Sequence, residues 1–245
     1  MADSVPVFRR VFMVIAFTVA VFIALLIARA VHTLYSVSSY KKSWQIESKA
    51  PIRKDALVVV GLGDSTVQGV GALRRSDSFI FQVSERAARD LKKDIQIYNF
   101  SVSGAESGEV LETQLPSVKK LSRIDAIVLA VGPNDLVHKK SIQSFLKSYE
   151  SILKQLPTEK LIIAELPPMG PKGVEGKGSY AWTKQLRRLA KEYDVRVAPV
   201  YAAIEPRAND FRTYGGDFFH PSGTGYSLWA NAFEQPLIEV LRSKK

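Results

Sequence analysis

The sequence predicts an α/β fold in which helices cover both faces of a mostly parallel sheet, preceded by one transmembrane helix. From residue 56 onward, short apolar runs alternate with stretches of helical periodicity. Such alternation is typical of right-handed crossovers between parallel strands. A separate apolar run near the N-terminus carries no charge and predicts the membrane helix.

The composition excludes several classes of site. The 245 residues include no cysteine, so disulfides, thiolate metal sites and a cysteine nucleophile are excluded. The formal net charge is +10, and half of it falls in residues 1–55. A basic region beside a membrane span favours anionic lipid head groups. Because basic and aromatic residues do not interleave and no nucleic-acid reader motif is present, we expect no nucleic-acid partner.

The membrane helix is predicted over Val11–Ala28, after an N-terminal tail at residues 1–10. This run of 18 residues has Thr18 as its single polar side chain, and its length suits the hydrocarbon core of a bilayer. A cleaved signal peptide is the alternative. However, Ala28-Arg29-Ala30 matches a small-residue cleavage site poorly. We therefore favour a retained signal anchor and a single-pass membrane protein.

The positive charges that flank the span are nearly balanced, since Arg9 and Arg10 precede it and Arg29, Lys41 and Lys42 follow it. Large domains are translocated largely regardless of charge. We expect the main domain outside the cytoplasm. The polar residues 29–55 are interpreted as a linker or stalk, and residues 56–245 as the main folded domain.

Five strands and five main helices are expected in the domain. The apolar runs that predict strands are Leu57–Gly61, Ile95–Phe100, Ala126–Val131, Leu161–Leu166 and Val195–Val200. The stretches that predict helices are Ser78–Lys92, Glu106–Leu115, Ser141–Leu156, Tyr180–Tyr193 and Ser222–Leu241. The loop Pro167–Gly178 is longer than a plain connection and is expected near the functional site.

A candidate nucleophile follows the first strand. Leu57–Val60 reads as a strand buried on both faces, and Gly61 and Gly63 allow a sharp turn before Asp64-Ser65. This order places the Ser65 hydroxyl just past the carboxyl end of a central strand, where ligands bind in open α/β sheets. A dinucleotide fingerprint is disfavoured because Thr66 stands where the third glycine would be.

A serine nucleophile needs a base, and the chain has three histidines. His32 flanks the membrane span, and His138 stands beside two lysines. His220 follows Asp217 by three residues, a spacing at which a turn can bring the carboxylate to the imidazole. We therefore expect His220 to be the base. Phe218 and Phe219, which lie between the two, are candidates for a substrate pocket.

Oxyanion donors are expected at two further strand ends. Gly104 follows the second strand in Asn99–Gly104, and its backbone N–H can approach a substrate oxygen closely. Asn134 follows the third strand in Gly132-Pro133-Asn134-Asp135 and can donate from its amide. Each turn alone is weak evidence, but three polar turns at successive strand ends converge on one sheet edge.

The ordered set of blocks resembles the SGNH (GDSL-like) hydrolase family over about residues 56–242. The matching segments are Gly63-Asp64-Ser65, Asn99–Gly104, Gly132–Asp135 and Asp217-Phe218-Phe219-His220. The resemblance implies a three-layer α/β/α sandwich with a flavodoxin-like sheet. It also implies that Ser65 is the nucleophile, His220 the base and Asp217 its partner. The N–H groups of Ser65 and Gly104 and the Asn134 amide would form the oxyanion hole, with no cofactor and no metal.

The sequence thus predicts a membrane-anchored serine hydrolase that cleaves carboxylic esters, acyl or acetyl, through an acyl-enzyme. The substrate would be a small molecule or a lipid or glycan ester. Two alternatives remain open: an acyltransferase or deacetylase acting on cell-envelope glycans, and a non-catalytic membrane-tethered binding domain.

Overall fold

The computed structural model describes residues 7–169 and 176–243 and has one parallel sheet at its centre. The strands are β1 Leu57–Gly63, β2 Ile95–Asn99, β3 Ala126–Ala130, β4 Leu161–Ala164 and β5 Arg196–Ala198. Their spatial order is β2-β1-β3-β4-β5, and every pairing is parallel. This is the flavodoxin-like order, so the predicted fold class is confirmed.

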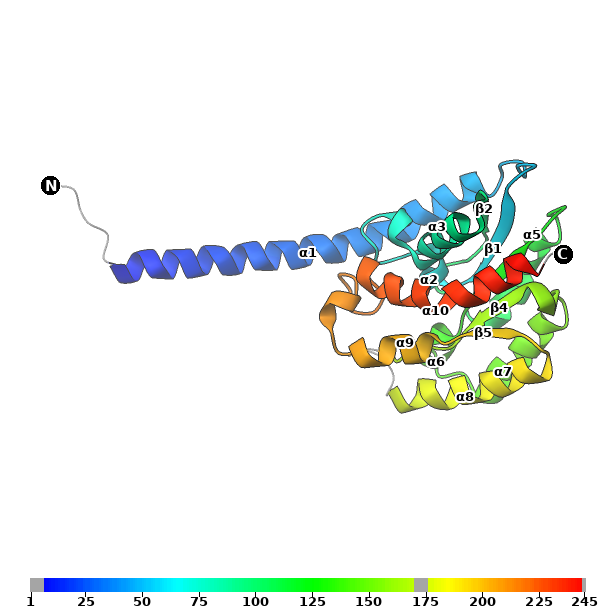
Figure 1. Ribbon diagram of the computed structural model, residues 1–245. Coiled ribbons are helices and arrows are strands. Elements are labelled where there is room, and N and C mark those ends of the chain that lie inside the picture. The colour runs from blue at the N-terminus through cyan, green and yellow to red at the C-terminus, as the bar shows by residue number, and fades with distance from the viewer. Residues whose placement is uncertain (1–6, 170–175, 244–245) are drawn as a thin grey trace.

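Helices connect the strands and cover both faces of the sheet (Figure 1). The α-helices are α1 Val7–Glu47, α2 Ser65–Gln68, α3 Phe79–Leu91, α4 Ser107–Glu109, α5 Leu115–Val118, α6 Pro133–Val137, α7 Ile142–Leu153, α8 Gly176–Glu192, α9 Val200–Ile204 and α10 Gly223–Arg242. Short 3-10 turns lie at Arg75–Asp77, Thr158–Lys160, Glu205–Arg207 and Phe211–Thr213, and a π-helical turn lies at Val110–Gln114.

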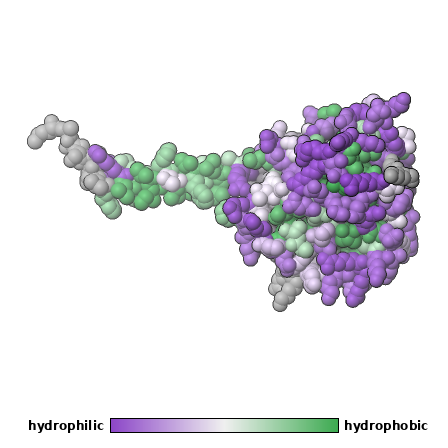
Figure 2. Space-filling view, in the orientation of Figure 1, coloured by the Kyte–Doolittle hydropathy of each residue, from purple (hydrophilic) through white to green (hydrophobic). Residues whose placement is uncertain are grey.

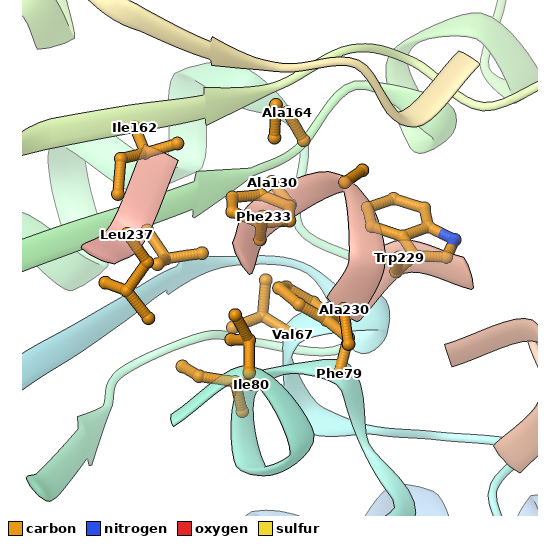
Figure 3. Close-up of a cluster of buried hydrophobic side chains, with 14 of the residues drawn as sticks. Val67, Phe79, Ile80, Ala130, Ile162, Ala164, Trp229, Ala230, Phe233 and Leu237 are labelled. Atoms are coloured by element: carbon orange, nitrogen blue, oxygen red, sulfur yellow. The ribbon is translucent and has the colours of Figure 1, made fainter. Parts of the chain in front are cut away.

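Two hydrophobic clusters, one on each face of the sheet, make up the core. Alternate residues of the strands supply them, so that Val59 faces one cluster while Val58 and Val60 face the other. In the first cluster Phe79 of α3 packs against Phe233 of α10, with ring centroids 5.0 Å apart (Figure 3). The second lies under α5, α7 and α8. The three layers hold the carboxyl ends of the strands at one edge.

The predicted elements differ from the observed ones mainly at their ends. The largest difference is at Glu106–Leu115, where a helix was expected to end before Pro116. The segment instead divides into α4, the π-helical turn and α5, and it continues to Val118. Pro116 is accommodated because it lies in the first turn of α5, where its missing N–H costs little.

The N-terminal segment is one continuous helix, α1 (Figure 1). Its first part is apolar, exposed and long enough to cross a membrane. Figure 2 shows that this hydrophobic part of α1 projects from a domain whose visible surface is largely hydrophilic. The expectation of a linker or stalk at residues 29–55 needs correction, because the helix continues to Glu47 and its second part packs on the domain.

The docked part of α1 presents one stripe of buried side chains, Thr33, Ser36, Tyr40 and Trp44. The spacing of three and four residues places them on one helical face. The Tyr40 hydroxyl donates to Ala72 O at 2.9 Å, and the Trp44 indole donates to Gln68 O at 3.0 Å. These four side chains of α1 are therefore buried with the domain, whereas the other residues of 33–44 are exposed or half-buried.

Trp44→Ala is expected to lower the free energy of unfolding by about 3–5 kcal/mol, as truncation of a buried aromatic does. Trp44 is 2% exposed, stacks on Phe81 at 5.0 Å and carries Arg75 over its ring at 4.3 Å. Denaturant unfolding in detergent, followed by near-UV circular dichroism, measures the change. Gln45→Ala, at the exposed neighbour, is the matched control. Equal free energies of unfolding for the two variants would mean that the packing of α1 on the domain does not stabilise it.

Candidate active site

Ser65 is the first residue of α2, directly after the carboxyl end of β1. The turn before it depends on Gly63, whose φ is +135°. A Cβ at Gly63 would lie 1.8 Å from Ala130 O, so no side chain fits between β1 and β3 there. Ser65 is buried, and its position is fixed by the strand and by the start of the helix.

Asp64 caps the helix that begins at Ser65. Its Oδ1 accepts a hydrogen bond from Thr66 N at 2.8 Å, which satisfies one of the free N–H groups of the first turn. Its Oδ2 is buried and has no hydrogen-bond partner among the residues that the structure describes. Burial raises the pKa of Asp64 to about 6, against the lowering effect of the hydrogen bond from Thr66. Above that pH the buried Asp64 carboxylate is ionised, and its burial lowers the stability of the folded state.

Asp217 and His220 lie in the loop before α10 and form one turn. Asp217 Oδ1 accepts hydrogen bonds from the backbone N–H groups of Phe219 and His220, each at 3.1 Å. Its Oδ2 lies 2.5 Å from His220 Nδ1. Burial acts to raise the pKa of Asp217, but the hydrogen bonds from His220 and Phe219 hold the pKa below its ordinary value. The carboxylate thus orients the imidazole ring.

The imidazole reaches the serine. His220 Nε2 lies 2.8 Å from Ser65 Oγ, which is hydrogen-bond distance between residues 155 positions apart. The structure therefore brings together all three side chains that were predicted from the sequence. With Nδ1 bound to the carboxylate, Nε2 is free to accept the proton of the Ser65 hydroxyl, which is the geometry that activates a serine for attack.

The loop after β2 is hydrogen-bonded to the turn that carries Ser65, and the loop after β3 is hydrogen-bonded to the loop after β2. Val102 N donates to Gly63 O at 3.0 Å. The Asn134 side-chain amide donates to Ala105 O at 3.0 Å, which fixes Asn134 next to Gly104. Gly104 has a φ of +85°, and the space where its Cβ would lie is open. These loops can present N–H donors to an oxygen bound near Ser65.

A further hydrogen-bonded link fastens the same two loops. Asp135 accepts from Ser107 N at 2.9 Å and from Ser107 Oγ at 2.6 Å, and both side chains are buried. Burial raises the pKa of Asp135, and the Ser107 hydrogen bonds oppose this. The loop after β2 and the loop after β3 therefore act as one rigid unit.

Gln114 is a positioning residue that sequence reasoning missed. Its Oε1 accepts from Gly63 N and its Nε2 donates to Gly63 O, both at 2.8 Å. The side chain is fully buried and lies at the end of the π-helical turn. It fixes the peptide groups two residues before Ser65. A lone glutamine in a polar helix carries no sequence signal of this role.

A small apolar recess of about 50 Å³ adjoins His220. Phe219, Trp229 and Pro168 are among its lining residues. Phe219 is thus at the pocket as expected, whereas Phe218 does not line it. Residues 170–175 of the predicted loop Pro167–Gly178 lie outside the described residues, and its described start contributes to the recess.

The other two histidines have different hydrogen-bond partners. His138 is exposed and lies 2.7 Å from Glu106, and His32 Nε2 lies 3.2 Å from Ala72 O beside α1. Residues 7–169 and 176–243 contain no group of three or more His, Asp or Glu side chains that could bind a metal ion.

Comparison with known proteins places this geometry in context. Residues 62–228 match the family described as "GDSL-like Lipase/Acylhydrolase family". The chain is 24% identical over 217 residues to the uncharacterized protein YpmR of Bacillus subtilis, covering 75% of this chain and 82% of that protein. It is 23% identical over 195 residues to the spore germination lipase LipC of Bacillus licheniformis, covering 69% and 91%. The crystal structure of the lipase Lip_vut3 from a goat rumen metagenome superposes with a TM-score of 0.61 at 20% identity, over 74% of this chain and 97% of that one.

Asp64→Asn is expected to stabilise the protein at pH 8 but not at pH 4. The pKa of Asp64 rises from 3.8 to about 6 on folding, so the folded state favours the protonated acid. The contribution of Asp64 to the free energy of unfolding is fully present below pH 4 and is lost as the pH rises through 6. Asparagine can still cap the helix and does not titrate. The free energy of unfolding of the variant, relative to that of wild type, should therefore be about 2–3 kcal/mol higher at pH 8 than at pH 4.

Denaturant unfolding at pH 4, 6 and 8 measures this gain. Asp55→Asn, which changes an exposed carboxyl before β1, is the matched control. A difference between Asp64→Asn and wild type that stays constant over the three pH values would contradict the burial cost assigned to Asp64.

Proposed function

Because the chain belongs to the GDSL-like lipase/acylhydrolase family, we propose that it is a membrane-anchored serine hydrolase that cleaves carboxylic esters. The observation that carries the proposal is the continuous hydrogen-bonded series from Ser65 through His220 to Asp217. A buried hydroxyl, an imidazole within reach and a carboxylate with a lowered pKa are the parts that acyl transfer to serine requires.

In the proposed reaction Ser65 Oγ attacks the ester carbonyl carbon while His220 Nε2 takes the hydroxyl proton. The resulting imidazolium is stabilised by Asp217. The C–O bond to the alcohol then breaks, and His220 returns the proton to the leaving alcohol. A water molecule attacks the acyl-enzyme with His220 again as base, which releases the carboxylic acid and restores the Ser65 hydroxyl.

The negative oxygen of each tetrahedral intermediate needs donors. The backbone N–H groups of Ser65 and Gly104 and the amide of Asn134 are the proposed ones. The open space at Gly104 and the hydrogen bond that fixes Asn134 beside it support this assignment. Donors fixed in advance stabilise charge that develops in the transition state without having to reorganise.

Membrane anchoring is supported by the length and exposure of the apolar part of α1. A signal peptide would be cleaved near Ala28-Arg29-Ala30, yet α1 runs through these residues without a break. The Arg29 guanidinium also donates to Tyr214 O at 2.9 Å, and the Arg29 backbone packs against Gly216, where a Cβ would lie 2.1 Å from the Arg29 carbonyl carbon. Both observations favour a retained anchor. We propose that the catalytic domain lies on the extracytoplasmic side, because large domains are translocated largely regardless of the flanking charges.

Ser65→Ala should reduce hydrolysis of a short-chain aryl ester by at least about 10³-fold, because no other hydroxyl lies against His220 Nε2 among the described contacts. The release of the coloured phenol measures the rate. Ser122→Ala, at an exposed serine before β3, is the matched control and should retain wild-type activity. Wild-type rates in the Ser65 variant would refute the mechanism.

Labelling by a fluorophosphonate separates an enzyme from a binding domain, since the probe reacts with an activated serine hydroxyl. Wild type should be labelled, and Ser65→Ala should not. If wild type resists labelling although its fold is intact, the domain is a non-catalytic binding module. If an added saccharide acceptor takes the acyl group faster than water does, the protein is an acyltransferase that uses the same site.

Asn134→Ala should lower kcat by about 10²–10³-fold with a much smaller change in KM, as the loss of one oxyanion donor does. Steady-state kinetics with the aryl ester test this. Gln155→Ala, on the surface after α7, is the control amide variant. An equal rise in KM with unchanged kcat would show that Asn134 binds the substrate rather than the transition state.

A further inference from the structure

The loop that carries Asp217 rests directly on α1. Gly216 N donates to Thr33 Oγ1 at 3.1 Å, and Arg29 donates to the carbonyl of Tyr214 at 2.9 Å. A Cβ at Gly216 would lie 2.1 Å from the carbonyl carbon of Arg29. The backbone next to the proposed catalytic aspartate is therefore in direct contact with the helix backbone, with no room for a side chain between them.

The loop after α2 makes a second contact of the same kind. Gly71 N lies 3.4 Å from Ser36 Oγ, and a Cβ at Gly71 would lie 2.8 Å from His220 Cβ. His32 Nε2 lies 3.2 Å from Ala72 O. Two loops on either side of His220 thus lie on the same turns of α1, at residues 29–36.

These turns begin where the apolar run ends. Ala28 is the last residue of the uncharged segment and Arg29 is the next charge. At 1.5 Å per residue, Thr33 lies about 7.5 Å beyond Ala28 along the helix axis. The polar layer on each side of a bilayer is about 5–8 Å thick. A span that ends at Ala28 would therefore hold the Asp217 loop at the level of the lipid head groups.

The carboxyl edge of the sheet lies on the same side as the free part of α1. In Figure 1, α2, α6 and α9, each of which follows a strand, lie on the side of the sheet toward which the free part of α1 extends. The carboxyl edge of the sheet, with Ser65, thus faces the region that a membrane around α1 would occupy. Were the domain turned the other way, its active-site edge would face away from the bilayer.

The surface beside this contact suits a bilayer interface. A groove of about 310 Å³ lies next to α1, with Arg29, Arg212 and Leu73 in its lining. Leu73 is 67% exposed, and Phe211, which precedes Arg212, is 62% exposed. Cations complement anionic head groups, and exposed Phe and Leu side chains can insert at the boundary between head groups and acyl chains. Asp77 and Arg212 of this groove are both ion-paired, to Arg74 and to Asp210, so the positive charge that it offers comes from Arg29.

We infer that α1 fixes the active-site edge against the bilayer that it crosses, so that the substrates are acyl esters of lipids resident in that same membrane. The inference rests on the proposed function, because it requires both the ester chemistry of Ser65 and the anchoring by α1. It adds that the distance between the span and the Asp217 loop, less than two helical turns, determines which esters reach the site.

A rigid spacer tests this distance. Seven residues of Glu, Ala and Lys inserted between Ala28 and Arg29 would extend the helix by about 10 Å and keep its face nearly in phase, because seven residues make almost two turns. The same seven residues inserted between Arg10 and Val11 form the control, since they leave the height of the domain unchanged. Each protein is reconstituted into vesicles of phosphatidylethanolamine and phosphatidylglycerol that contain a fluorescent-acyl phosphatidylglycerol.

The spacer after Ala28 should reduce release of the fluorescent acid at least tenfold, while hydrolysis of a soluble aryl ester stays within twofold of wild type. The control insertion should change neither rate. Equal lipid hydrolysis by the two insertion variants would overturn the inference, as would a wild type that cleaves the aryl ester and leaves the vesicle lipid intact. A wild type that cleaves neither substrate would instead refute the proposed esterase function.

Discussion

The hydrogen bond between Ser65 Oγ and His220 Nε2 is the contact on which the remaining chemistry depends. It joins the turn after the central strand to the loop before the last helix, 155 residues later. The His220 backbone can pack closely on the loop after α2 because residue 71 is a glycine, where a Cβ would lie 2.8 Å from His220 Cβ. Formation of the site thus requires the complete sheet and close backbone packing around it.

The fold and the main site residues were predictable because both leave local signals. Apolar runs such as Leu57–Val60 and Ala126–Val131 mark buried parallel strands. Polar turns after successive strands must meet, since the carboxyl ends of parallel strands share one edge. The positions of Ser65, Gly104 and Asn134 follow from this rule, whereas the approach of His220 relied on the ordered blocks and their family resemblance.

The supporting contacts were missed in the sequence, for two physical reasons. The stripe Thr33, Ser36, Tyr40 and Trp44 is half polar, so it resembles a solvated helix or linker more than a core face. It could have been found by its spacing of three and four residues. Gln114 reaches Gly63 from a π-helical turn, which shifts the register of the helix and has no simple pattern in the residues.

The continuity of α1 changes what an anchor can do for the domain. A flexible linker would let the domain take many orientations, and a site on it would meet the bilayer only part of the time. A helix that is continuous to Glu47 and buries Tyr40 and Trp44 in the domain core cannot bend at Arg29 without losing hydrogen bonds to Tyr214 and Gly216. Under the proposed anchoring, the residues that fasten α1 to the domain would therefore also orient the edge of the sheet that carries Ser65.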